Sequence, residues 1–270
     1  MTDLRVAIAG AGGRMGAANI RAIANTPGIV LHAAFERPGS SVLGRDAGEM
    51  AGIGPAGIVI GDDPEAAVAG ADAIIDFTGP AVSVLLAELA ATRGLVDIIG
   101  TTGCTKEEDW AIAKSGSAGA RIVKSGNFSL GVNLLAGLVR QVAAALPDYD
   151  IEVLEMHHNR KVDAPSGTAL LLGQAAAEGR GVEFDTRAVL SREGHTGARV
   201  PGSIGFATLR VGNVIGEHTV MFAGETERIE ITHRATDRGM FAAGAVRAAL
   251  WAKDQPPGFY DMADVLGFKE

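Results

Sequence analysis

The sequence of 270 residues contains a single cysteine and no long apolar run. Cys104 has no partner within the chain, which excludes an internal disulfide framework and favours a reducing compartment. No window approaches the roughly 18 apolar residues that a membrane-spanning helix needs. The N-terminus has only a short apolar run before a glycine-rich turn, which is not typical of a signal peptide. We therefore expect a cytoplasmic protein with no membrane partner.

The chain also lacks an excess of positive charge. It carries 24 Lys and Arg residues against 32 Asp and Glu residues, a formal net charge of −8. This balance argues against a nucleic acid or an anionic membrane as the main partner. Hydrophobic residues make up 47% and charged residues 21%, as in an ordinary globular protein. The length allows one large domain or two modest ones.

In the first half, short apolar runs alternate with helical segments. The expected strands are Leu4–Ala9, Ile29–Phe35, Ala73–Phe77, Val96–Ile99 and Arg121–Lys124, and the expected helices are Ala17–Asn25 and Ala81–Arg93. Strands separated by helices and glycine-rich turns predict βαβ units in a doubly wound, Rossmann-like α/β sheet. Residues 37–61 are glycine-rich, and we expect a loop there with at most a short helix.

The pattern changes near residue 128. The expected helices are Leu130–Leu146, Thr168–Glu178 and Phe241–Trp251, and the expected strands are Ile151–Met156, Phe184–Ser191, Ile204–Val211, Glu217–Ala223 and Arg228–His233. Strands this numerous with so few helices predict a second, α+β domain with a mixed, open sheet. We place this substrate-binding and oligomerisation domain at residues 128–240. The dinucleotide-binding domain then comprises residues 1–127 and 241–270.

A glycine-rich loop follows the first expected strand. Its residues are Gly10, Ala11, Gly12, Gly13, Arg14, Met15 and Gly16. Glycines after a first strand allow a tight turn and the close approach of a pyrophosphate, which the next helix N-terminus stabilises. A strict G-x-G-x-x-G motif counted from Gly10 would need glycine at position 15, where Met15 stands. The interpretation therefore rests on the strand before the loop and the helix after it. The loop predicts a dinucleotide site, with Arg14 as a further phosphate contact.

Two residues at the end of the second strand bear on the choice of nucleotide. Glu36 lies about 20 residues beyond the loop, where an acidic side chain can bind the adenine ribose hydroxyls. Arg37 beside it can pair with the 2′-phosphate of NADP. The two residues argue in opposite directions, so both NADH and NADPH remain candidates.

Two more loops follow later strands at their carboxyl ends, where ligands bind in open α/β sheets. They contain the residues Gly100, Thr101, Thr102, Ser125, Gly126, Asn127 and Phe128. Small residues with exposed backbone donors suit a nicotinamide carboxamide and its ribose.

The segment 155–168 gathers groups that repel one another when charged. It places His157, His158, Arg160 and Lys161 within five residues, ahead of the turn Pro165–Thr168. A core would not accommodate them, whereas a site that binds a small dianion and protonates it would. An imidazole titrates near pH ~6.5 and is a competent acid at neutral pH. A metal site is not expected, because neither cysteines nor a Glu-x-x-His pattern accompany the histidines.

The turn after the cationic residues predicts an anion site of its own. Ser166 is a good helix N-cap, and Gly167 would let a ligand approach the first turn. Free backbone N–H groups at such a start bind carboxylates. We expect Asp163 to fix the loop and Arg160 to lie at the rim of the site.

Taken together, these motifs resemble one family. The matching segments occur in order along nearly the whole chain: Gly10–Gly16, Asp76–Thr78, Gly100–Gly103, Asn127–Ser129, His157–Thr168, Ser191–Gly197 and Gly216–Thr219. The set is similar to the bacterial 4-hydroxy-tetrahydrodipicolinate reductases, also called dihydrodipicolinate reductases, of lysine and diaminopimelate biosynthesis. The run from His157 to Thr168 is highly specific, and the glycine loop is not.

The resemblance implies a homotetrameric enzyme that reduces a cyclic dicarboxylate imine with NADH or NADPH. It implies that His157 is the proton donor and Lys161 the second catalytic cation. The substrate positions that it implies are His158, Gly167 and Thr168. The cofactor positions that it implies are Gly10, Ala11, Gly12, Gly13, Arg14, Met15, Glu36, Arg37, Gly100, Thr101, Thr102, Ser125, Gly126, Asn127 and Phe128.

The sequence departs from the family pattern at a few positions. Cys104 stands where an aromatic residue is common, Arg160 where some members have a third histidine, and Ser125-Gly126 where Ala-Ala or Ala-Pro is frequent. Two other functions remain open: another small NAD(P)-dependent dehydrogenase, of the aspartate or homoserine type, and a non-catalytic nucleotide sensor. The former should lack the 161–168 segment, and the latter has no need of His157 and Lys161.

Overall fold

The computed structural model describes residues 2–268 of the chain. These residues form two compact units, one that combines the N-terminal part up to Leu130 with the segment from Gly239 onward, and one that comprises Gly131–Arg238. Each unit has its own sheet and its own apolar core. The architecture confirms the expected α/β fold, with a Rossmann-like sheet and a second, mixed sheet.

The sheet of the first unit has seven strands, all parallel. In spatial order they are β12 (Gly258–Tyr260), β6 (Arg121–Lys124), β5 (Val96–Ile99), β4 (Ala73–Asp76), β1 (Leu4–Ala9), β2 (Ile29–Phe35) and β3 (Ile60–Gly61). The chain order reverses between β1 and β4, so the loops that follow these strands open a crevice at the carboxyl edge.

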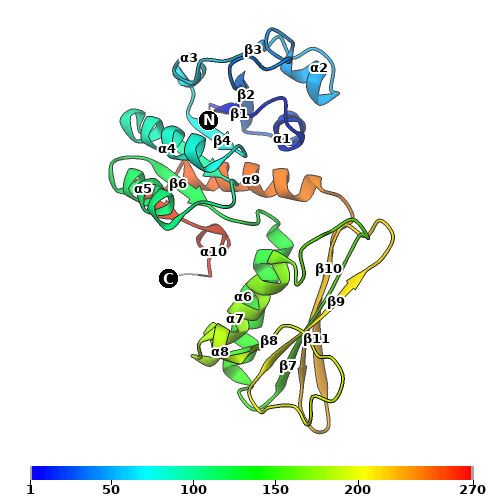
Figure 1. Cartoon of the computed structure of the whole chain (residues 1–270). Helices are drawn as coiled ribbons and strands as arrows, with labels where there is room; N and C mark the ends of the chain where they lie inside the picture. The colour runs from blue at the N-terminus through cyan, green and yellow to red at the C-terminus, as the bar shows by residue number, and fades with distance from the viewer. Residues whose placement is uncertain (1, 269–270) are drawn as a thin grey trace. The chain divides into compact units, whose positions relative to one another are not determined.

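Helices cover both faces of this sheet (Figure 1). They are α1 (Arg14–Ala24), α2 (Ala47–Ala51), α3 (Pro64–Val68), α4 (Pro80–Arg93), α5 (Lys106–Ser117), α9 (Gly239–Ala252) and α10 (Met262–Val265). α1 and α9 pack with one core cluster, and α4 and α5 with the other. Because both faces are covered, the central strands β4 and β5 are mostly apolar rather than alternating, with Asp76 and Asp97 as their buried polar residues.

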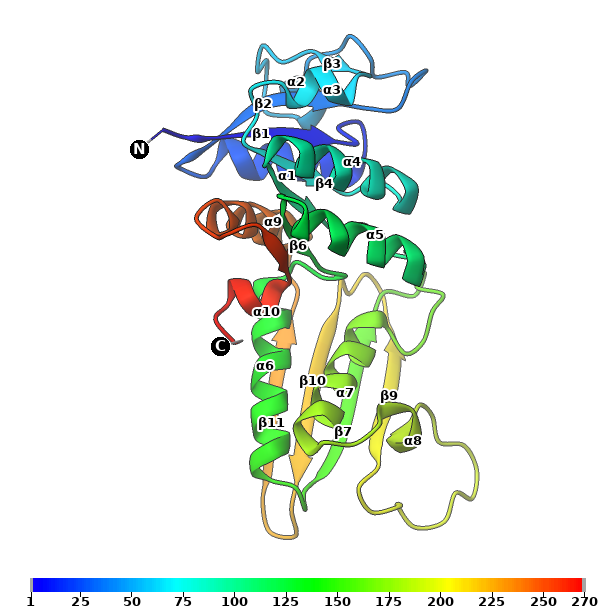
Figure 2. The same ribbon diagram turned by 90° about the vertical axis from the view of Figure 1, so that its left-hand side faces the viewer.

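The second unit has a mixed sheet of five strands. In spatial order they are β11 (Arg228–Arg234), β10 (Glu217–Ala223), β7 (Asp150–His157), β9 (Ile204–Arg210) and β8 (Ala188–Val189). β7 pairs antiparallel with β10 and parallel with β9. The helices α6 (Leu130–Ala145) and α7 (Gly167–Arg180) lie against one face, and no helix of this unit lies against the other (Figures 1 and 2).

The predicted strand Phe184–Ser191 is wrong. Residues Phe184–Arg187 form the short helix α8, and only Ala188–Val189 pair as β8. Phe184 and Ala188 stand one helical turn apart, and both pack against the core of this unit. Phe184 meets Phe206 edge to face at 6.1 Å between ring centroids. Tertiary packing at helical spacing therefore outweighs the β-propensity of the segment.

In the described part of the chain, no helix is both long enough and apolar enough to cross a membrane.

Among the described residues of the first unit, two buried side chains, Asn19 and Asp97, have no hydrogen-bond partner for their polar atoms. Asp97 lies in β5, is fully buried, and neither carboxylate oxygen has a hydrogen-bond partner among the described residues. Burial, together with the nearby charge of Asp76, raises the pKa of Asp97 well above its usual value. The folded state therefore favours the protonated form of this side chain.

This burial predicts a pH-dependent cost. The pKa of Asp97 is higher in the folded than in the unfolded chain. Its contribution to the free energy of unfolding is therefore fully present below pH ~4 and is lost as the pH rises. Asp97→Asn should remove that loss. The melting temperature of the variant relative to that of the wild type should therefore rise by about 3 °C between pH 4 and pH 8. Thermal denaturation over this range measures it, with the exposed Asp62→Asn as control. Parallel curves for wild type and Asp97→Asn would contradict the account.

Candidate active site

The glycine loop between β1 and α1 has the geometry of a close turn. Gly10 has φ +69°, a conformation that favours glycine. The Gly13 amide donates to the Gly10 carbonyl at 3.0 Å, which closes the turn. A Cβ on Gly16 would lie 2.3 Å from the same carbonyl, so only glycine lets α1 pack this close to the loop. The sequence identified this turn correctly, although α1 begins at Arg14, three residues earlier than predicted.

The N-terminus of α1 is open to an anion. Gly13 is its N-cap, no side chain caps it, and no acidic residue lies in its first turn. Gly12, Gly13 and Arg14 are exposed and Met15 is half-buried. Unsatisfied helical N–H groups with the positive end of the helix dipole favour a phosphate group. These residues fit the pyrophosphate of a dinucleotide.

Glu36 lies directly against this loop. Its carboxylate accepts a hydrogen bond from the Gly12 amide at 3.1 Å and another from the Arg37 amide at 3.0 Å. A Cβ on Gly12 would come within 3.1 Å of the Glu36 carboxylate. The side chain of Arg37 is exposed. The glycine loop and the end of β2 thus form one surface, which bears an acidic and a basic group side by side.

The loops after β4, β5 and β6 come together at the same sheet edge. A Cβ on Gly100 would lie 2.1 Å from the ring of Phe77, so the aromatic ring packs on bare backbone. Phe77 in turn packs against Phe128, with ring centroids 5.5 Å apart. The buried Thr101 hydroxyl accepts a hydrogen bond from the Thr78 amide at 3.1 Å.

The neighbouring residues of these loops are polar or open. The Ser125 hydroxyl donates to the Asn127 carbonyl at 2.8 Å, and Gly126 and Thr102 are exposed. Asp76 was not predicted as a site residue, but its carboxyl group holds this region together through hydrogen bonds from Ser83 and Thr78. Burial raises the pKa of Asp76, although these hydrogen bonds oppose the shift.

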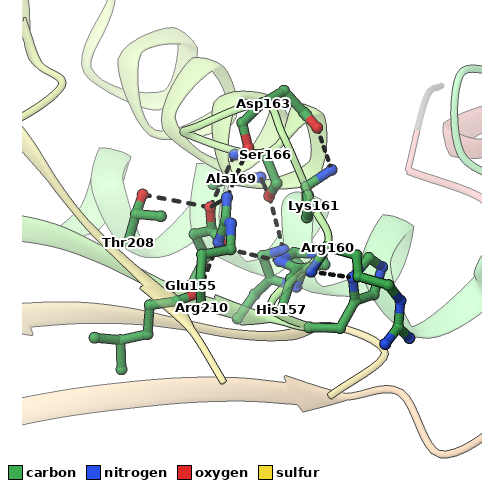
Figure 3. Close-up of polar contacts among 12 residues, drawn as sticks. Glu155, His157, Arg160, Lys161, Asp163, Ser166, Ala169, Thr208 and Arg210 are labelled. Carbon is green, nitrogen blue, oxygen red and sulfur yellow. Dashed lines mark hydrogen bonds and ion pairs between the residues drawn. The ribbon is translucent and has the colours of Figure 1, made fainter. Parts of the chain in front are cut away.

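In the second unit, β7 ends at His157, the residue that the sequence predicts to be the proton donor. Its buried face reads Ile151, Val153, Glu155, His157, because alternate residues of a strand share a face. His157 is the last residue of β7, and its Nδ1 lies 2.6 Å from Glu155 Oε2 (Figure 3). The strand therefore changes from an apolar core to a polar site along the same face.

Glu155 is the centre of the polar contacts in Figure 3, and sequence analysis did not identify it. Its side chain is fully buried. Arg210 donates to both carboxylate oxygens, at 2.9 and 3.0 Å, and the Ser166 amide donates at 3.0 Å. Burial would raise the pKa of Glu155, but the hydrogen bonds from Arg210 and His157 outweigh it, and the pKa lies below its usual value.

Lys161 and Asp163 form an ion pair, with Nζ 2.9 Å from Oδ1. The lysine side chain is mostly covered, whereas Asp163 is more than half exposed. The hydrogen bond from Lys161 lowers the pKa of Asp163. The Asp163 carbonyl also accepts from Arg210 at 2.7 Å. Asp163 therefore both fixes the loop and holds the ammonium group.

The helix α7 begins as the sequence predicted. Ser166 is its N-cap, and its hydroxyl accepts from the Ala169 amide at 3.2 Å. Gly167 is exposed, with nothing within 4 Å of the position a Cβ would take, and Thr168 is half-buried. No acidic residue lies in the first turn. This start of a helix is suited to bind a carboxylate.

His158 completes the positive environment. Partial burial, with the positive charges of Arg160 and Arg238, lowers the pKa of His158. The Arg160 guanidinium donates to Asn213 Oδ1 at 3.1 Å, and its backbone amide donates to His158 Nδ1 at 3.2 Å. Arg238 was not singled out by sequence, because it lies 80 residues away in the chain.

A second imidazole is buried beside the first. His218 meets His157 edge to face, with ring centroids 5.1 Å apart, and its Nε2 lies 3.1 Å from the Ser166 hydroxyl. Burial lowers the pKa of His218 to about 4, so this ring is neutral at physiological pH. His195, in contrast, is exposed in the segment between β8 and β9.

Within the second unit, the structure thus brings together the His157 imidazole, the Lys161 ammonium group and the start of α7, where Ser166 is the N-cap and Gly167 is exposed. Such an arrangement can bind a small carboxylate and supply a proton to it. Within the first unit, the predicted cofactor residues share the carboxyl edge of the parallel sheet. Among the described residues, no group of three or more His, Cys, Asp or Glu side chains is placed to hold a metal ion.

Comparison with known proteins gives matches over almost the whole chain. Residues 4–128 match the family "Dihydrodipicolinate reductase, N-terminus", and residues 131–266 match "Dihydrodipicolinate reductase, C-terminus". The 4-hydroxy-tetrahydrodipicolinate reductase of Agrobacterium fabrum is 58% identical and covers 100% of this chain and 98% of its own length. That of Rhodopseudomonas palustris is 57% identical, with 100% of both chains covered.

Solved structures agree with the fold. Dipicolinate-bound dihydrodipicolinate reductase from Paenisporosarcina sp. TG-14 is 23% identical, with a TM-score of 0.78, and the match covers 97% of this chain and 99% of that one. An amine dehydrogenase from Mycobacterium smegmatis is 14% identical, with a TM-score of 0.62 over 96% and 94% of the two chains. On the family matches and the close relatives, this chain belongs to the dihydrodipicolinate reductase family.

Proposed function

We propose that this protein reduces 4-hydroxy-tetrahydrodipicolinate to tetrahydrodipicolinate with NADH or NADPH, in lysine and diaminopimelate biosynthesis. The observation that carries the proposal is the grouping of His157, Lys161 and the open start of α7 in a chain 57–58% identical to reductases of that name. The lone Cys104 and the use of a reduced nicotinamide suit a reducing compartment, and we propose that the protein is located in the cytoplasm.

The first unit supplies the residues that fit the dinucleotide. The N-terminal amides of α1 and Arg14 would hold the pyrophosphate, and Glu36 or Arg37 the adenosine ribose or its phosphate. The loops at Gly100–Thr102 and Ser125–Phe128 would hold the nicotinamide end. A bound NADH or NADPH supplies the hydride. The tight packing of Gly16 on Gly10 keeps the loop backbone close to the position of the phosphates.

The second unit supplies the proton and binds the substrate. The substrate is a small dicarboxylate, so one carboxylate group fits the backbone donors at Gly167 and Thr168. Lys161 can exchange Asp163 for a substrate carboxylate and neutralise its charge. Partial burial and the neighbouring cations lower the pKa of His158, and its neutral ring can contact the substrate. The 4-hydroxyl group of the substrate leaves as water, the hydride reduces the resulting ring, and His157 donates the proton that quenches the negative charge left on it. Arg160 remains at the rim, bound to Asn213.

We further propose a homotetramer built through the uncovered face of the second sheet. On that face lie Leu154, Met156, Leu209 and Met221, which alternate with the buried residues of their strands. Leu209 is 41% exposed. Apolar side chains on a sheet face without a covering helix favour burial against another copy.

The assignment of the two catalytic residues predicts a loss of turnover without a loss of nucleotide binding. His157→Gln should lower kcat by about 10²–10⁴-fold, because general acid catalysis contributes that much. Lys161→Ala should lower kcat/KM through lost carboxylate binding. The assay follows NADH or NADPH absorbance with the freshly made condensation product of aspartate-semialdehyde and pyruvate. The exposed His195→Gln serves as the matched control.

Three results would decide between the candidate functions. No oxidation of either nucleotide by the wild type would refute the reductase. Nucleotide binding with no turnover of any substrate would favour a sensor, and turnover of aspartate or homoserine instead would favour another dehydrogenase. Unchanged rates for both variants would remove His157 and Lys161 from the mechanism.

The surface formed by Glu36 and Arg37 predicts opposite effects on the two nucleotides. Glu36→Ala should weaken NADH binding by about tenfold or more, since a charged hydrogen bond contributes about 1.5–3 kcal/mol. Arg37→Ala should weaken NADPH binding to a similar degree and leave NADH binding little changed. Fluorescence titration of each variant with each nucleotide measures this. Equal losses for both nucleotides in both variants would contradict the division of roles.

The proposed tetramer predicts a mutation that separates assembly from folding. Met221→Glu should lower the mass measured by light scattering, because a carboxylate buried in an apolar interface is costly. Leu85→Glu, on the 64% exposed position of α4, is the control and should leave the mass unchanged. A wild type that is monomeric at micromolar concentration would refute the assembly.

A further inference from the structure

The buried carboxylate of Glu155 touches two parts of the site at once. One oxygen, Oε2, lies 2.6 Å from His157 Nδ1, and the other, Oε1, accepts from the Ser166 amide at 3.0 Å. Ser166 is the N-cap of α7. A single side chain therefore connects the proposed proton donor to the helix start where the carboxylate of the substrate is proposed to bind.

The surroundings of Glu155 keep it ionised. The carboxylate accepts hydrogen bonds from Arg210 to both oxygens and from the Thr208 hydroxyl at 3.3 Å, in addition to the two above. These donors fill its acceptor sites, and an ionised carboxylate has no proton to give. Burial without them would leave a carboxyl group protonated.

An ionised acceptor at Nδ1 decides which nitrogen of the ring is free. The Nδ1 of His157 must carry a hydrogen to bond with Glu155, so the neutral ring is unprotonated at Nε2. The Nε2 side of the ring faces Gly216, where a Cβ would come within 3.0 Å. The absence of a side chain at Gly216 leaves room beside the nitrogen that exchanges the proton.

The neighbouring His218 has no carboxylate against its ring. It is buried, its Nδ1 has no hydrogen-bond partner among the described residues, and burial lowers its pKa to about 4. The centroids of the two rings are 5.1 Å apart. Of the two, the His157 ring has a carboxylate oxygen against its Nδ1.

We propose that Glu155, held in place by Arg210, is a positioning residue for the reductase reaction: it fixes the Nδ1–H tautomer of His157, stabilises the imidazolium form, and sets the start of α7 relative to that ring. This inference rests on the proposed function only for the identity of the reaction. The proton passes from Nε2 to the substrate, the hydrogen on Nδ1 stays in place, and a proton from water later restores the imidazolium.

Other charged and titratable groups lie around His157. Glu155, His158 and His218 interact with its charge, and Arg210 acts through Glu155. Arg160, Lys161 and Arg238 act on His158, and Lys161 and His233 act on His218. Glu155 is the acidic member that contacts the ring directly. Its removal should therefore disfavour the protonated ring, and the pH at which turnover is lost on the alkaline side should fall.

The first test needs no mutation. Nitrogen-15 NMR of the histidine rings in the full-length protein should show neutral His157 with a protonated Nδ1 and a bare Nε2. The signal is assigned by its absence in His157→Gln. The opposite tautomer, with the hydrogen on Nε2, would overturn the proposal whether or not the protein reduces the proposed substrate.

The second test is the pH profile of Glu155→Gln, which keeps the shape of the side chain. We expect kcat to fall by about 10–100-fold, a part of the contribution of the general acid, and the alkaline limb to move about one pH unit lower. The KM for the nucleotide should not change. Glu178→Gln is the matched control, since it removes a glutamate–arginine pair with Arg140 from the same unit.

The two tests separate a positioning role from a structural one. If Glu155→Gln lowered kcat equally at every pH with its alkaline limb unmoved, Glu155 would be structural and the proposal would fail. If the wild type did not oxidise either nucleotide, the proposed function would fail instead, and the NMR result would still decide the tautomer.

Discussion

The buried ion pair between Glu155 and Arg210 is the interaction on which the second unit depends. Near the end of β7, a carboxylate occupies the position on the buried face where an apolar side chain would continue the core. The sheet register places Arg210 of β9 beside His157 of β7. The Arg210 guanidinium offsets the cost of burying the Glu155 carboxylate. Breaking a buried pair by removing one partner is costly because the other charge is left unpaired. The strand, the loop 158–165 and the start of α7 are all bound to this pair.

The first unit depends on a different constraint, the absence of side chains. Gly16 and Gly100 allow a helix and an aromatic ring to approach backbone that any Cβ would block. These contacts place the loops after β1, β4 and β5 at one edge of the sheet. The two units thus prepare their sites by opposite means: the first by leaving atoms out, and the second by satisfying a buried charge.

The sequence predicted those features that are local. The strands β1, β2, β5, β6 and β10 begin and end at the residues predicted for them. The helix α7 begins at its predicted cap, because Ser166 signals it within the segment itself. α5 was not predicted, although the capping box of Thr105 and Glu108 was a readable signal. The strand predicted at Phe184 was wrong because packing against Phe206, far along the chain, decides that segment.

The site was predictable to the same extent. His157, Lys161 and the turn at Ser166 lie in one segment, and their residue types point to the chemistry proposed for them. Glu155 could have been found from strand periodicity, since it lies two residues before His157 on the same face. Arg210 and His218 could not, because only sheet register brings β9 and β10 to β7.

The ion pair of Lys161 with Asp163 has a consequence for how this site can be specific. The loop carries its own carboxylate, Asp163, which pairs with the Lys161 ammonium group at 2.9 Å. Any incoming anion must therefore compete with a tethered one, and a ligand with a single carboxylate gains little from the exchange. A ligand with two carboxylates would also gain the proposed contacts at the start of α7. In the proposed reaction, Asp163 would thus disfavour ligands with a single carboxylate and would keep the Lys161 ammonium group paired between turnovers.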